Sequence, residues 1–82
     1  MFYVSQHQLL NLQQNVNEVA VFEVGLPNNM VLHSTFVYIK EGYFQCLWEA
    51  DHIDNIQQYI DTTVGDECQS DYYSIDPMTA IA

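Results

Sequence analysis

Hydrophobic and polar residues alternate along several short segments of the chain, which is the pattern of half-buried β-strands. The segments rich in aromatic and β-branched residues are 2–7, 30–40, 43–50 and 67–76. Pro77 follows the last of them and cannot pair in a strand ladder. The pattern therefore predicts four strands.

Between the first two strands, apolar residues recur at helical spacing. Asn11 can cap a helix, and its apolar stripe then consists of Leu12, Val16, Val19 and Ala20. We expect this helix to end near Val24, because Gly25 and Pro27 follow. Residues 18–24 also fit a strand, in which case the helix ends before Val19.

A second helix is predicted from about His52 to Val64. Asp51 is the expected N-cap and Gly65 the expected stop. The residues that would face the sheet are Ile53, Ile56, Ile60 and Val64.

The element order β-α-β-β-α-β in a single domain, residues 1–82, predicts an α+β, ferredoxin-like fold. Four antiparallel strands would carry two helices on one face, and the other face would be solvated or covered by a partner. Because a chain of 82 residues buries only a modest core, we expect a homodimer. It would be a dimeric α+β barrel or a dimer packed sheet to sheet.

The turn between the two middle strands sets their expected register. If Glu41 and Gly42 form a two-residue turn, Lys40 lies opposite Tyr43 and side chains alternate between two faces. The nearly apolar set is expected under the helices: His33, Thr35, Val37, Ile39, Phe44, Cys46, Trp48 and Ala50. The other set would form the open face: Leu32, Ser34, Phe36, Tyr38, Tyr43, Gln45, Leu47 and Glu49.

The aromatic part of this open face is the candidate binding surface. It comprises Phe36, Tyr38, Tyr43 and Leu47. Exposed apolar surfaces of this kind pack against a second subunit or line a pocket. We expect a dimer interface, and a pocket for a small hydrophobic molecule is the alternative.

The charge balance excludes two classes of partner. Eleven acidic residues stand against Lys40 alone, giving a net charge of −10. Nucleic-acid binding requires a basic surface, and an anionic membrane surface is disfavoured for the same reason. No apolar run reaches the ~18–20 residues of a membrane span. With no signal-peptide pattern and only two cysteines, the expected location is cytoplasmic.

Three histidines, His7, His33 and His52, are the candidate metal ligands. His33 would lie near Asp51 and His52, and His7 could contribute together with a second subunit. His33 and Cys46 would be about 13 Å apart along the expected strands, too far to share one ion.

The two cysteines are not expected to be nucleophiles. Cys46 lies in an apolar row and should be buried, whereas acidic residues beside Cys68 should raise its pKa. No catalytic sequence motif is present, so catalysis is not expected.

The stretch VLHSTFVYIKEGYFQCLWEAD and the ending YYSIDPMTA resemble a family of small bacterial ferredoxin-like proteins of unknown function, one of which binds nickel. The matching residues within about 31–80 are His33, Ser34, Cys46, Trp48, Ala50, Ile75, Asp76, Pro77, Thr79 and Ala80. The resemblance implies a ferredoxin-like fold, a homodimer and nickel as the metal. The first strand of the nickel-binding member is rich in histidine, and here that strand contains only His7.

Overall fold

The computed structural model describes residues 1–11 and 26–76. The strands are β1 (Phe2–Leu9), β2 (Met30–Tyr38), β3 (Tyr43–Ala50) and β4 (Cys68–Ile75). Between β3 and β4 lie the helix α2 (Ile53–Val64) and the 3-10 turn η1 (Gly65–Glu67). All four predicted strands are confirmed with small changes at their ends. The predicted helix over residues 12–24 lies outside the described residues.

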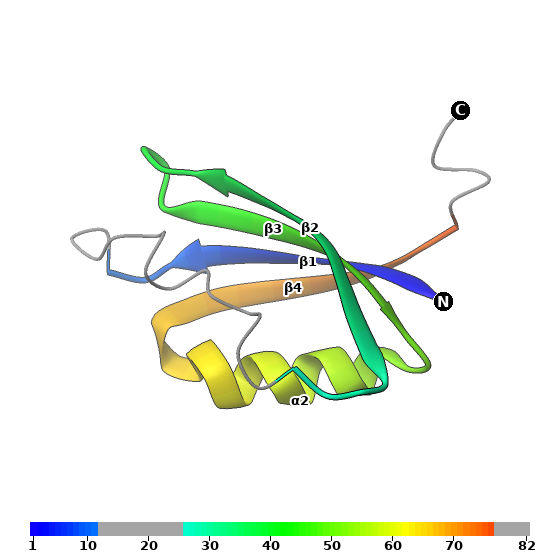
Figure 1. The fold of residues 1–82 in the computed structure, drawn as a ribbon. Coiled ribbons are helices and arrows are strands. Elements are labelled where there is room, and N and C mark those ends of the chain that lie inside the picture. The colour runs from blue at the N-terminus through cyan, green and yellow to red at the C-terminus, as the bar shows by residue number, and fades with distance from the viewer. Residues whose placement is uncertain (12–25, 77–82) are drawn as a thin grey trace.

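The strands form one antiparallel sheet in the order β2-β3-β1-β4. Figure 1 shows α2 running along one face of this sheet, below β1 and β4. The predicted α+β class and the four-stranded antiparallel sheet are therefore confirmed.

The hydrophobic core lies between α2 and the sheet. The alternate residues of β3 that face it are at most 4% exposed: Phe44, Cys46, Trp48 and Ala50. From α2, Ile56, Ile60 and Val64 are buried as predicted, and Ile53 packs at the edge of the core. Tyr59 is also buried, and its ring centroid lies 5.9 Å from that of Trp48. An amphipathic helix packed on the apolar face of a sheet is the physical basis of this layer.

The predicted register of the middle hairpin is wrong by two positions. Tyr38, not Lys40, pairs with Tyr43, so the loop has four residues, 39–42. Gly42 takes the positive φ of 60° that closes it, and its amide donates to the Ile39 carbonyl at 3.4 Å. Because side chains alternate with period two, a shift of two residues keeps each side chain on its expected face.

A β-bulge at His33 produces a second correction. Leu32 pairs with Trp48, but Ser34 pairs with Leu47, so one extra residue is inserted in β2. Leu32 therefore packs against the core, although it was predicted on the open face. His33 contacts Phe2 and Glu49 instead of the apolar row that contains Cys46.

The start of α2 also differs from the prediction. His52, not Asp51, is the N-cap; its backbone is extended and its side chain makes no capping hydrogen bond. The first turn contains Asp54, whose charge favours a helix N-terminus. Gly65 occupies the C-cap position, as expected.

Candidate functional site: the open face of the sheet

We call the face of the sheet turned away from α2 the open face (Figure 1). Its side chains come from alternate residues, as the strand registers require. They are Phe2, Val4, Gln6, Gln8, Val31, Ser34, Phe36, Tyr38, Tyr43, Gln45, Leu47, Glu49, Gln69, Asp71, Tyr73 and Ile75, with His33 at the bulge.

Large apolar side chains on the open face are accessible to solvent. Phe36 is 55% exposed, and Val31, Tyr38 and Tyr73 are between 47% and 49% exposed. Tyr38 and Tyr43 have ring centroids 5.3 Å apart, and the Tyr43 hydroxyl donates to Gln45 Oε1 at 3.3 Å. The four residues predicted for a binding surface, Phe36, Tyr38, Tyr43 and Leu47, thus share this face.

Charge is scarce on the open face although the chain carries a net charge of −10. Its strands contain two acidic residues, Glu49 near one end of β3 and Asp71 on β4. The polar groups in between are the uncharged amides Gln6 and Gln45. A surface with exposed apolar side chains and few charged groups is typical of the core of protein interfaces.

One ion pair lies at the end of the open face. His33 Nε2 is 3.0 Å from Glu49 Oε1, with the side chains 37% and 47% exposed. The Phe2 ring lies beside His33, with centroids 5.6 Å apart. Such an exposed pair contributes at most about 1 kcal/mol to stability.

The three histidines predicted as metal ligands occupy different surroundings. His33 is on the open face, His52 is exposed at the start of α2, and His7 is fully buried under the sheet's other face. Within residues 1–11 and 26–76, no three His, Cys, Asp or Glu side chains form a group that could hold a metal ion.

His7 lies inside a buried polar network that the sequence did not predict. Its Nδ1 is 2.7 Å from Ser70 Oγ, and its Nε2 is 2.7 Å from Ser5 Oγ. Trp48 Nε1 donates to the same Ser5 oxygen at 2.8 Å, and Phe44 stacks on the imidazole with centroids 4.5 Å apart. We expected His7 at the end of its strand, but β1 continues to Leu9 and places it in the interior.

The network favours a neutral imidazole. Indole N–H can only donate, so Ser5 accepts from Trp48 and can donate its own proton to His7 Nε2. The proton on Nδ1 then reaches Ser70. Burial lowers the pKa of His7 to about 4.

Both cysteines are free, buried thiols. Burial raises the pKa of Cys46 to about 11, although hydrogen bonds from Thr35 and Ser5 oppose the shift. The pKa of Cys68 is also raised to about 11, first by burial and then by the charge of Glu67. Raised pKa values keep both thiols protonated near neutral pH, whereas the thiolate is the reactive form.

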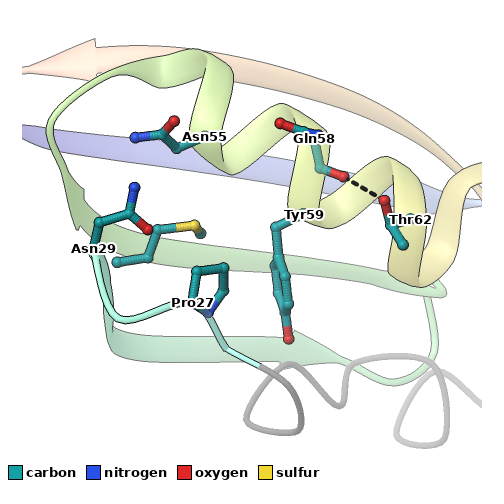
Figure 2. A pocket seen from close by; sticks show the side chains of 7 residues that line it. Pro27, Asn29, Asn55, Gln58, Tyr59 and Thr62 are labelled. Carbon is teal, nitrogen blue, oxygen red and sulfur yellow. Dashed lines mark hydrogen bonds between the residues drawn. The ribbon is translucent and has the colours of Figure 1, made fainter.

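A hollow of about 340 Å³ lies beside α2, away from the open face. Figure 2 shows Asn55, Gln58 and Thr62 of α2 along one side and Pro27 and Asn29 opposite them. The Thr62 hydroxyl already donates to the Gln58 carbonyl at 2.8 Å. Among the described residues that line this hollow, none carries a charge and none is a histidine or cysteine.

Comparisons of the chain with family models, with curated proteins and with solved structures gave no match. In the described part of the chain, no helix is both long and apolar enough to cross a bilayer.

Proposed function

We propose that this protein is a small binding module that works through the open face of its sheet and pairs there with a second copy of itself. The observation that carries the proposal is an exposed apolar surface with little charge on a chain that is otherwise strongly acidic. Two such faces can approach each other because most carboxylates of each copy lie elsewhere. No catalytic role is proposed.

The fold that we propose for the whole chain is ferredoxin-like. β1 and β2 each pair antiparallel with β3, so they run parallel with β3 between them. This strand order supports the split β-α-β arrangement, in which a helical crossover joins two parallel strands. The first helix stays a prediction from the stripe Leu12, Val16, Val19 and Ala20.

A charge placed at the centre of the open face should separate the dimer. We expect Leu47→Asp to convert a wild-type dimer into a monomer, because a buried, unpaired carboxylate costs several kcal/mol. Sedimentation velocity measures the mass of each species, and circular dichroism checks that the variant stays folded.

Ile39→Asp is the matched control for this experiment. Ile39 is 66% exposed in the β2–β3 loop, so the same change in charge should leave the dimer intact. A wild-type protein that is monomeric at high concentration would contradict the proposal, as would equal dissociation of both variants.

A small hydrophobic molecule held between two open faces is the second candidate. The exposed rings of Phe36 and Tyr38 support it, since apolar and aromatic side chains line most ligand pockets. An environment-sensitive apolar dye distinguishes the two: a ligand cavity takes up the dye in the dimer, whereas tightly packed faces exclude it.

Nickel binding stays a prediction from the sequence resemblance. In the described residues, His33 and Glu49 are neighbouring side chains with metal-ligating atoms. A complete coordination shell needs further ligands from outside the described residues of one copy. His7 is not available for this role without opening the core, because it is fully buried.

A further inference from the structure

The two edges of the sheet are not protected equally. Among the described strands, β2 and β4 each have one neighbour. β2 carries the bulge at His33, which is a common way of spoiling an edge for further pairing. β4 pairs with β1 over all eight of its residues without a register shift and contains no proline or lysine. A regular edge of this kind is a template for another strand.

Backbone hydrogen bonds show which residues of β4 direct their N–H and C=O groups away from β1, toward the free edge of the sheet. The Leu10 amide donates to the Glu67 carbonyl at 3.0 Å, and the β1–β4 register then assigns residues 69, 71, 73 and 75 to bonds with β1. The hydrogen bonds on the other side of β1 are consistent with this assignment. The Met1 carbonyl accepts from the Ala50 amide, and the Leu9 amide donates to the Gly42 carbonyl, so the odd-numbered residues of β1 bond toward β3. The backbone N–H and C=O groups that point away from β1 are therefore those of Cys68, Ser70, Tyr72 and Ser74. No described strand pairs with these groups.

Asp71 opposes pairing of this edge with itself. When two antiparallel copies of β4 pair so that all four outward-bonding residues take part, residue 68 lies opposite residue 74, and Asp71 lies opposite Asp71 of the second copy. Like charges placed directly opposite each other destabilise a strand pair. Glu67 and Asp76, which flank β4, add further negative charge. The edge is thus open to strand addition but unfavourable for a second copy.

We propose that the edge of β4 binds an extended peptide segment of another protein, with a lysine or arginine of that segment facing Asp71. Strand addition satisfies the outward backbone groups of β4, and the cationic residue supplies the charge that this chain lacks, since Lys40 is its only Lys or Arg. The backbone groups that would bind the peptide lie along the edge of β4, whereas the Asp71 side chain belongs to the open face, so the lysine of the peptide would lie at the rim of that face.

The probe is a short synthetic peptide of alternating threonine and valine with a central lysine, compared with the same peptide bearing a central glutamate. Fluorescence anisotropy of the labelled peptides measures their affinity for the intact protein. We expect the lysine peptide to bind about tenfold more tightly than the glutamate peptide, because Asp71 attracts lysine and repels glutamate. Absence of binding by the lysine peptide would overturn the proposal.

N-methylation of the peptide separates strand addition from simple attraction of charges. The Asp71 backbone bonds to β1, so the lysine directly opposite Asp71 must also turn its amide away from β4. Methylating the two neighbouring amides should weaken binding about tenfold or more. Methylating the lysine amide itself should leave the affinity unchanged, and equal losses from both modifications would contradict strand addition.

A pair of protein variants tests the position of the charge. Asp71→Asn should remove most of the preference for lysine over glutamate, whereas Asp54→Asn should retain it because Asp54 lies on the exposed side of α2. An equal effect of both substitutions would show that only the overall charge matters, and would reject a site facing Asp71.

Discussion

Replacement of Ile56 by alanine is expected to lower the free energy of unfolding by about 2–5 kcal/mol. Ile56 has no exposed surface and lies on the side of α2 that packs against the sheet. Truncation removes buried methyl groups and leaves a cavity, because surrounding side chains relax only in part. A small domain has a total stability of about 5–15 kcal/mol, so this change removes a large share of it.

Urea unfolding at one fixed protein concentration measures the effect of Ile56→Ala. Ile39→Ala is the matched control, because it makes the same chemical change at a side chain that is 66% exposed in the β2–β3 loop. Its effect should stay within about 0.5 kcal/mol. A similar loss in both variants would mean that α2 does not pack on the sheet as described.

The parts of the fold that the sequence predicted well are those with a strong periodic pattern. β3 was predicted with its observed bounds, and its buried row is the one expected under the helices. The prediction of which side of α2 is buried was also correct, because Ile56, Ile60 and Val64 lie together on one apolar side of that helix. Burial of an apolar stripe is a strong, non-directional effect that periodicity reports directly.

The errors arose where one residue or one turn decides the geometry. Four residues, rather than two, close the β2–β3 loop, and Gly42 can serve either turn. The bulge at His33 exchanged the expected faces of Leu32 and His33. Nothing in the alternation of polar and apolar residues around His33 distinguishes a bulge from a regular strand.

The buried network around His7 was missed because the residues are polar. In FYVSQHQL, the alternate positions Tyr3, Ser5, His7 and Leu9 face inward. The sequence pattern contains this information, because Ser5 and His7 lie between the apolar residues Tyr3 and Leu9 on the same side of the strand. The predicted strand 2–7 stops before Leu9, the residue that completes this row. Buried polar groups are acceptable when they are hydrogen-bonded to each other, as Ser5 and His7 are.

Acidification should destabilise the protein through His7. Burial holds the pKa of His7 at about 4 in the folded chain, against roughly 6.5 when unfolded. Between these two values the unfolded chain binds more protons, so stability falls as the pH drops through this window. From about pH 7.5 to about pH 5 the contribution of His7 amounts to a loss of about 2 kcal/mol.

His7→Gln isolates this contribution from that of the carboxylates, which titrate in both proteins. The glutamine amide can still donate and accept hydrogen bonds with Ser5 and Ser70, but it cannot take up a proton. Urea unfolding of both proteins across this pH range gives the difference in their free energies of unfolding. At neutral pH the wild type should be the more stable, and its advantage should shrink by about 2 kcal/mol toward pH 5.

His52→Gln is the control for loss of a histidine as such. His52 is exposed at the start of α2 and makes no side-chain capping bond, so this variant should keep the pH dependence of the wild type. If His7→Gln also kept it, His7 would have to exchange protons freely in the folded state. The buried chain from Trp48 through Ser5 and His7 to Ser70 would then not exist in solution.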